Sequence, residues 1–198
     1  MKRVVAVTGG IACGKSTVAL TLGELGCEVL DTDDVAHDLE SAGGEATPLL
    51  AAAFGDAVIG AGGAVDRRKL GAVVFSDPAA LERLNSIIHP LIDARVRQWI
   101  ASRRENAVCA VLVPLLFESE FDVKFKWDAI VAVVCSEEEQ VRRVCARGFR
   151  EDEARARIAA QMPCEEKAAR ADFAIRNNGT IADLRAEVEK VFNAISGL

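Results

Sequence analysis

The residues from Gly9 to Ser16 read Gly-Gly-Ile-Ala-Cys-Gly-Lys-Ser and fit the phosphate-loop (P-loop) pattern G-x-x-x-x-G-K-[ST]. Glycines let a backbone curl closely around an anion, and successive N–H groups then point at phosphate oxygens. In such a loop Lys15 reaches the β- and γ-phosphates, and the Ser16 hydroxyl holds Mg²⁺. The alternative is a glycine-rich turn in an unrelated protein. The pattern predicts a nucleoside triphosphate site, provided that a strand precedes it and a helix follows.

A second polar cluster, Asp31-Thr32-Asp33-Asp34, follows the next apolar stretch. Acids at the carboxyl end of a strand lie on the sheet edge that carries ligands in open α/β folds. A carboxylate there orients an acceptor hydroxyl, accepts its proton during phosphoryl transfer, and helps to hold Mg²⁺ directly or through water. The alternative is a helix N-cap, a position that Asp favours. We expect Asp33 to act in the chemistry and Asp34 to be a capping or solvated residue.

The elements around the glycine loop meet its structural requirement. The stretch 3–8 is short, β-branched and apolar, which favours a buried strand. The stretch 16–25 has helical spacing, with Val18 and Leu22 on one face and Gly26 as its stop. A strand, a loop and a helix in this order favour the P-loop interpretation over an unrelated turn.

Strand and helix signals alternate along the rest of the chain. Further strands are expected at 28–30, 108–114, 129–134 and 172–176. Further helices are expected at 35–39, 48–54, 137–147, 151–161 and 181–195, with a long one over 78–104 that Pro90 should kink or split. The alternation predicts an α/β fold, a P-loop NTPase-type parallel sheet flanked by helices. The helix-only stretch from about 43 to 104 resembles an insertion between the second and third strands.

The composition of this 198-residue chain fits a cytoplasmic enzyme. A net charge of −6 gives no general case for nucleic-acid binding. The six cysteines are scattered without a C-x-x-C pair, so reduced thiols are expected. Cys13 is the exception, because a thiol at a helix N-terminus ionises more easily, and its oxidation would block ATP. We expect no signal peptide and no membrane span, and the sequence does not indicate an oligomeric state.

Short sequence blocks occur in a characteristic order along almost the whole chain. They are Thr8-Gly9-Gly10-Ile11, Gly14-Lys15-Ser16-Thr17, Leu30-Asp31-Thr32-Asp33, Leu84-Asn85, His89-Pro90-Leu91-Ile92, Val113-Pro114-Leu115-Leu116-Phe117-Glu118, Arg157-Ile158, Gln161, Ala171-Asp172 and Asn177-Asn178-Gly179. Together these blocks resemble the dephospho-coenzyme A kinase family. The P-loop alone would indicate only a nucleotide-binding protein, whereas the combination is far more selective.

The resemblance implies transfer of the γ-phosphoryl group of ATP to the ribose 3′-hydroxyl of dephospho-CoA, giving CoA and ADP in the last step of CoA synthesis. It implies that Asp33 acts as the base or orients the acceptor, beside Asp31 as the first acid of the family motif. Arg67 and His89 fall in the segment that resembles the CoA-side domain. The implied ATP contacts are Thr8, Gly9, Gly10, Ile11, Ala12, Cys13, Gly14, Lys15, Ser16, Thr17, Arg143 and Asn177.

The resemblance also implies how the catalytic groups and domains are arranged. Asp33, Lys15 and Arg147 would be catalytic, with Ser16 and Asp33 as the Mg²⁺ ligands. Arg143 and Arg147 lead into a mobile lid over the phosphates, where cationic groups stabilise the transferring charge. Residues 1–40 and 106–198 would form the core, residues 41–105 the helical acceptor-binding insertion, and residues around 147–170 the lid.

Some positions depart from the family pattern, and some alternatives stay open. Ala12-Cys13 stands where Gly-Ser is common, and Arg176 stands where an Asp usually precedes the Asn. His89 could contact substrate or phosphate, or it could equally well lie within a helix with its ring bonded to a carbonyl freed by Pro90. Another small-molecule or nucleotide kinase would share the scaffold. A nucleotide-dependent switch would need a guanine-reading N-K-x-D motif, which the sequence lacks.

Overall fold

The computed structural model describes residues 1–75 and 77–197 and divides into two compact units. The core unit consists of Met1–Asp31 and Arg103–Leu198, and the helical unit consists of Thr32–Ser102. The chain therefore leaves the core unit after its second strand and returns to it before its third.

A five-stranded parallel sheet forms the centre of the core unit, in the order β2-β3-β1-β4-β5. Its strands are β1 (Arg3–Gly9), β2 (Glu28–Asp31), β3 (Val108–Leu112), β4 (Ala129–Val134) and β5 (Phe173–Arg176). The predicted parallel α/β sheet is confirmed, and every predicted strand is found within two residues of its expected ends.

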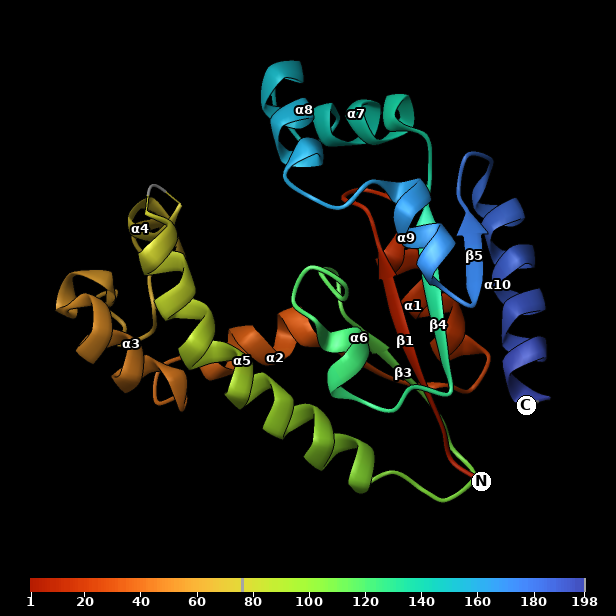
Figure 1. Ribbon diagram of the computed structural model, residues 1–198, viewed down its shortest axis with the longest axis horizontal. Helices are drawn as coiled ribbons and strands as arrows, with labels where there is room; N and C mark the ends of the chain where they lie inside the picture. The colour runs from red at the N-terminus through yellow and green to blue at the C-terminus, as the bar shows by residue number, and fades with distance from the viewer. Residues whose placement is uncertain (76, 198) are drawn as a thin grey trace. The chain divides into compact units, whose positions relative to one another are not determined.

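Strand β1 lies in the middle of the sheet, which explains its apolar sequence. Val5 and Val7 are at most 2% exposed, because strands flank β1 on both sides and helices cover both faces. Helices α1 (Lys15–Glu24) and α10 (Ile181–Ser196) pack on each other on one side of the sheet, and α9 (Cys164–Arg170) lies in front of β4 on the other (Figure 1). These layers position the loop that joins β1 to α1.

The remaining helices of the core unit follow β3 and β4. They are α6 (Phe121–Lys124), α7 (Glu137–Cys145) and α8 (Glu151–Ala159). Helices α7 and α8 confirm the two predicted charged helices. The sequence does not predict α6 and α9, because both are short and each buries a single residue, so neither carries a readable apolar stripe.

The helical unit is built around one long helix. Its elements are α2 (Thr32–Leu39), α3 (Ala46–Phe54), a 3₁₀ turn (Asp56–Val58), α4 (Arg67–Val74) and α5 (Pro78–Ala101). Helices α2, α3 and α4 each pack against α5. Pro90 does not split α5, because Ile88 and Ile92 are buried on either side of it and tertiary packing compensates the lost hydrogen bond. In the described part of the chain, no helix has both the length and the apolar character needed to cross a bilayer.

Candidate active site

The glycine loop follows β1 at the sheet edge where the parallel strands have their carboxyl ends. Strand β2 lies on one side of β1 and β4 on the other, so this edge contains the reversal point at which open α/β sheets bind ligands. The loop backbone has a φ of 100° at Gly14 and of 60° at Ala12. Glycine adopts such angles freely, whereas a left-handed alanine costs roughly 1–2 kcal/mol. The surroundings of Ala12 must therefore hold the loop in this shape.

Three side chains hold three consecutive carbonyl groups of the loop. Gln140 Nε2 donates to the Ile11 carbonyl at 2.9 Å, Arg143 Nη1 to the Ala12 carbonyl at 3.2 Å, and Asn177 Nδ2 to the Cys13 carbonyl at 2.8 Å. We call Gln140, Arg143 and Asn177 the loop clamp. In a trans peptide the C=O and the following N–H point in opposite directions. The clamp therefore turns the N–H groups of Ala12 and Gly14 away from itself, toward the concave side of the loop, whereas the Cys13 N–H donates to the Gly10 carbonyl at 3.3 Å.

Gln161 adds a fourth contact from the segment that leads into α9. Its Oε1 accepts a hydrogen bond from the Ile11 N–H at 2.9 Å, so this N–H binds protein rather than facing a phosphate. The sequence patterns assign no role to Gln140, and Gln161 occurs only among the matched blocks. Gln140 offers no signal of its own, because it lies in a helix that also carries five charged residues.

Lys15 and Ser16 lie in the first turn of α1, directly after the loop. Lys15 Nζ donates to the Gly9 carbonyl at 2.9 Å and to the Gly10 carbonyl at 3.1 Å. These bonds hold the ammonium group against the loop. Ser16 is exposed at the helix N-terminus, where the helix dipole attracts anions. The loop, the ammonium group and the helix end together offer the positive charge and hydrogen-bond donors that an anion requires.

Arg143 is tied to protein acceptors on three sides. Besides the Ala12 carbonyl, it donates to the Asn177 carbonyl at 3.0 Å and to Glu139 Oε1 at 2.7 Å. Hydrogen bonds from Arg142 and the charge of Arg143 lower the pKa of Glu139 to about 2. As the structure has it, Arg143 positions the loop backbone through its guanidinium group.

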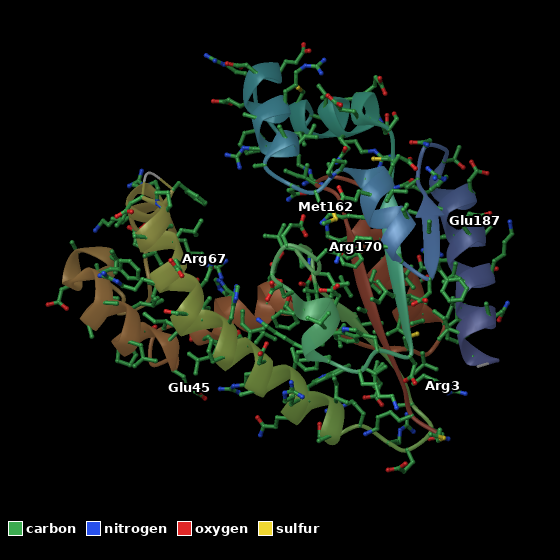
Figure 2. The ribbon with its side chains drawn as sticks, viewed as in Figure 1. Arg3, Glu45, Arg67, Met162, Arg170 and Glu187 are labelled. Atoms are coloured by element: carbon green, nitrogen blue, oxygen red, sulfur yellow. The ribbon has the colours of Figure 1, made fainter. Side chains whose placement is uncertain are left out.

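A buried network supports the loop at the carboxyl end of β3. The Pro114 carbonyl accepts from Thr8 Oγ1 at 3.2 Å and from Lys167 Nζ at 3.1 Å. Lys167, which is fully buried, also pairs with Glu118 at 2.7 Å. Glu118 also accepts a hydrogen bond from the Met162 N–H at 3.0 Å. Met162 is labelled in Figure 2 and lies just before α9 in the chain. Thr8 is itself fully buried, so its side chain supports the loop and does not line a nucleotide surface.

The pKa of Glu118 reflects this network. Burial acts to raise that pKa, but hydrogen bonds from Lys167 and Met162 outweigh burial and keep it below its usual value. The carboxylate is therefore held in its charged form opposite the buried ammonium group.

The predicted easy ionisation of Cys13 is wrong. Its side chain is fully buried and lies 3.2 Å from Cys135 Sγ instead of being exposed at the helix end. The hydrogen bond with Cys135, together with burial, raises the pKa of Cys13 to about 11. The thiol therefore does not ionise easily.

The acidic cluster divides between a strand and a helix. Asp31 ends β2 opposite Leu112 of β3, at the same sheet edge as the glycine loop. Helix α2 begins directly afterwards at Thr32, earlier than the predicted start at residue 35. Asp33 and Asp34 are exposed in its first turn, where carboxylates interact favourably with the helix dipole. Asp34 is the third residue of α2, so the solvated alternative holds for it and the capping one does not.

The other predicted site residues lie in three different elements. Arg67 starts α4 and donates to Glu40 at 2.5 Å within the helical unit. His89 is half-buried in the middle of α5. Arg147 is exposed beyond the end of α7, directly before Gly148, which has a φ of 94°. The core unit thus brings together the loop, Arg143 and Asn177, while Asp33, Arg67 and His89 belong to the helical unit.

No protein-only metal centre is found among the described residues. Within 1–75 and 77–197, no group of three or more His, Cys, Asp or Glu side chains could hold a metal ion. A loop with one hydroxyl ligand suits Mg²⁺ that arrives with phosphate oxygens, because Mg²⁺ binds few protein ligands and keeps several waters.

Comparisons with known proteins give a consistent result. The family model described as dephospho-CoA kinase (CoaE) matches residues 3–183. The dephospho-CoA kinase of Aromatoleum aromaticum is 44% identical, with 95% of this chain and 91% of that protein covered. The crystal structure of TT1252 from Thermus thermophilus has a TM-score of 0.83 at 36% identity, covering 98% of this chain and 97% of the other. The structure of dephospho-CoA kinase from Campylobacter jejuni has a TM-score of 0.66 at 28% identity, covering 100% and 99%.

Proposed function

Because this chain belongs to the dephospho-CoA kinase family, we propose that its glycine loop binds ATP and its helical unit binds the acceptor. The protein is an ATP-dependent kinase that transfers the γ-phosphoryl group of ATP to the ribose 3′-hydroxyl of dephospho-CoA. The product is CoA, so the reaction is the final step of CoA synthesis. The observation that carries the residue assignment is the loop clamp.

The clamp supports an ATP site because it orients backbone donors before any ligand binds. With the carbonyls of residues 11–13 held on one side, the N–H groups of Ala12 and Gly14 face the other side and need no rearrangement, while the Cys13 N–H closes the turn onto Gly10. Preorganised donors of this kind stabilise the charge that develops on a transferring phosphoryl group. Lys15 would leave the carbonyls of Gly9 and Gly10 and bridge the β- and γ-phosphates. Asn177 and Arg143 would act on ATP through the loop that they hold.

Mg²⁺ would be held at the start of α1. The ion bridges phosphate oxygens and neutralises charge there. Ser16 is exposed in the first turn of α1 and would supply its hydroxyl oxygen. Asp33 would contribute its carboxylate, either directly or through water.

Chain connectivity supports a role for Asp33 beside the loop. Asp31 ends β2 at the sheet edge that carries the loop, and Asp33 follows two residues later. Its Cα therefore lies within about 7 Å of the Asp31 Cα, whatever the placement of the helical unit. We propose that Asp33 accepts the proton of the acceptor hydroxyl, and that Arg67 and His89 contact anionic groups of dephospho-CoA.

Arg147 would approach the phosphates from a lid. It is exposed, and Gly148 after it has the positive φ that lets a chain turn sharply. We propose residues 147–160 as the lid, a shorter segment than the expected 147–170. Gln161 is bonded to the loop and Lys167 is fully buried, so both suit the fixed core better than a moving segment.

We propose that the protein works in the cytoplasm. All six cysteines are free thiols, which suits a reducing compartment. ATP and dephospho-CoA are then its partners in that compartment.

The acceptor is tested by measuring ADP release with dephospho-CoA, adenosine and AMP as rival acceptors. We expect only dephospho-CoA to sustain turnover. Comparable turnover with AMP or adenosine would contradict the proposal and favour another nucleotide kinase on the same scaffold.

The role of Asp33 is tested by Asp33→Asn, which keeps the size of the side chain but removes the proton acceptor. A positioned base contributes typically ~10²–10⁴-fold to rate, so we expect turnover to fall by about that factor while ATP still binds. Asp34→Asn is the matched control on the same turn of α2 and should leave turnover unchanged. An inactive Asp34→Asn beside an active Asp33→Asn would shift the assignment by one residue.

A further inference from the structure

Three thiols that are far apart in the sequence meet behind the glycine loop. Cys13 Sγ lies 3.2 Å from Cys135 Sγ and 3.5 Å from Cys164 Sγ. Cys13 belongs to the loop, Cys135 directly follows β4, and Cys164 begins α9. The folded chain thus places the sulfur of a loop residue in hydrogen-bonding contact with two others.

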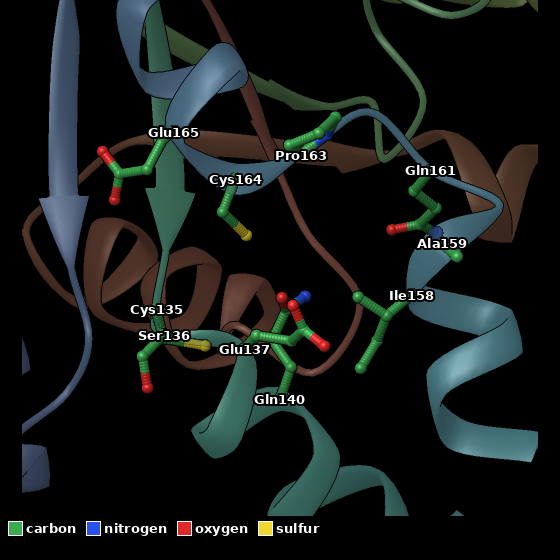
Figure 3. A pocket seen from close by; sticks show the side chains of 10 residues that line it. All are labelled: Cys135, Ser136, Glu137, Gln140, Ile158, Ala159, Gln161, Pro163, Cys164 and Glu165. Atoms are coloured by element: carbon green, nitrogen blue, oxygen red, sulfur yellow. The ribbon is translucent and has the colours of Figure 1, made fainter. Parts of the chain in front are cut away.

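A cavity of about 380 Å³ gives small molecules access to this cluster. Figure 3 shows the side chains that line it, which come from the end of β4, from α7 and α8, and from the start of α9. Cys135 and Cys164 are among them, whereas Cys13 lies behind and is fully buried. A small oxidant in the cavity therefore meets Cys135 and Cys164 before it meets Cys13.

We propose that the cluster is an oxidation site, in which a peroxide oxidises Cys135 and Cys13 then closes a Cys13–Cys135 disulfide. In the first step the Cys135 sulfur attacks a peroxide oxygen, the O–O bond breaks, and the released hydroxide takes up a proton to become water. In the second step the Cys13 sulfur attacks the Cys135 sulfenic acid. The S–O bond breaks, and the hydroxide leaves with the Cys13 proton as a second water. Two thiols and one hydrogen peroxide thus give one disulfide and two waters, with sulfur oxidised and peroxide reduced.

The geometry favours Cys135 over Cys164 as the first nucleophile. Cys135 lines the cavity and is the nearer neighbour of Cys13. The hydrogen bond between Cys135 and Cys13 lowers the pKa of Cys135. By contrast, the hydrogen bond between Cys164 and Cys13, followed by burial, raises the pKa of Cys164. Thiolates rather than thiols are the nucleophiles in this chemistry, so Cys135 is the more reactive of the two lining thiols.

A disulfide here would deform the glycine loop. The sulfur atoms must approach from 3.2 Å to about 2.05 Å. Cys13 sits between Ala12 and Gly14, which both have positive φ, and its carbonyl is held by Asn177. Pulling its side chain toward Cys135 shifts the peptide groups on both sides of Cys13. One carries the Cys13 N–H, which closes the turn onto Gly10, and the other carries the Gly14 N–H, which faces the concave side of the loop. ATP affinity should therefore fall. This consequence rests on the ATP site proposed above, whereas the formation of the disulfide is independent of that site.

The test treats the purified chain with hydrogen peroxide and measures intact mass, disulfide-linked peptides and ATP affinity. We expect a mass loss of two hydrogen atoms, a link between the peptides of Cys13 and Cys135, and at least about tenfold weaker ATP binding. A thiol reductant should restore both mass and affinity. A disulfide with unchanged ATP affinity would contradict the role of the loop in this inference, while no disulfide would contradict the oxidation site itself.

Two variants separate this site from general oxidation. Cys135→Ser should keep turnover and ATP affinity and should resist peroxide. Cys145→Ser, on α7, removes a partly exposed thiol and should stay as sensitive as the parent. If circular dichroism shows that the serine variant does not fold, Cys135→Ala replaces it in the same test. A link through Cys164 in place of Cys135, or equal peroxide sensitivity in a folded Cys135 variant, would overturn the proposal.

Discussion

Arg143 and Arg155 are placed very differently, although both lie in the pair of charged helices after β4. The Arg143 side chain is 20% exposed and bonds two backbone carbonyls, one of them in the glycine loop. The Arg155 side chain is 55% exposed and bonds the carboxylates of Glu151 and Glu137 on the surface. Exposed ion pairs contribute about 0–1 kcal/mol, because water and salt screen them. The contrast teaches that an arginine contributes more to the structure through the backbone carbonyls it binds than through its ion pairs.

The largest expected contrast lies between the buried pair under the loop and a surface pair. Glu118→Gln leaves the fully buried Lys167 without its counter-charge, so we expect a loss of about 3–5 kcal/mol in the free energy of unfolding. Glu151→Gln, which breaks a surface pair with Arg155, should change that free energy by less than about 0.5 kcal/mol. Urea denaturation of both variants measures the difference. Equal losses would remove the distinction between the two regions.

The same pair predicts a pH dependence. The pKa of Glu118 is lowered in the folded state, so its stabilising effect is present above the unfolded pKa of about 4.3 and is lost as pH falls through the folded pKa. We expect the parent to lose stability more steeply than Glu118→Gln on acidification below about pH 4. Parallel stability curves would mean that Lys167 does not hold the carboxylate in its charged form.

Lys15→Ala tests the side of the loop that would face the phosphates. Removing a charge aimed at the phosphates should reduce turnover by about 10²–10³-fold and weaken ATP binding, while the fold is retained. Steady-state kinetics with circular dichroism as the folding control measures this effect. Turnover near that of the parent would show that the loop is not the working ATP site.

Arg143→Ala and Arg155→Ala test the comparison directly, with the smallest expected effects. Arg143→Ala frees the carbonyls of Ala12 and Asn177, so we expect ATP binding to weaken by about 1–3 kcal/mol, or roughly fivefold to 150-fold. Arg155→Ala should bind ATP within about 0.5 kcal/mol of the parent. Calorimetric titration of both variants decides, and equal losses would assign the effect to the charge of the helices and not to the clamp.

Much of the fold follows from local patterns that the sequence displays directly. The β-branched run of β1, the glycine pattern after it and the spacing of Leu184 and Val188 in α10 all predict their elements correctly. Pro90 misleads, because a local rule predicts a break where tertiary packing keeps α5 continuous. Helix α9 is missed because its buried residue is a lysine, whose partner Glu118 lies 49 residues away in the sequence.

The candidate site is predictable where it depends on a fixed spacing and not where it depends on long-range contacts. The residues of the glycine loop follow from the motif itself. The loop clamp does not, because Gln140 lies 129 residues and Asn177 164 residues from the loop carbonyls that they hold. The predicted ionisation of Cys13 fails for the same reason. A thiol at a helix end is expected to ionise, and only the folded chain brings Cys135 beside it.

The distance in sequence between the loop and its clamp has a consequence for synthesis on the ribosome. The loop emerges well before Gln140, Arg143 and Asn177, which all lie much later in the chain. A nascent chain that ends before residue 140 contains β1, the loop and α1, but none of the groups that orient the loop carbonyls. Contacts this far apart also form slowly in refolding, because long loops must close first. The glycine loop therefore becomes able to bind a nucleotide only long after its own residues have been made.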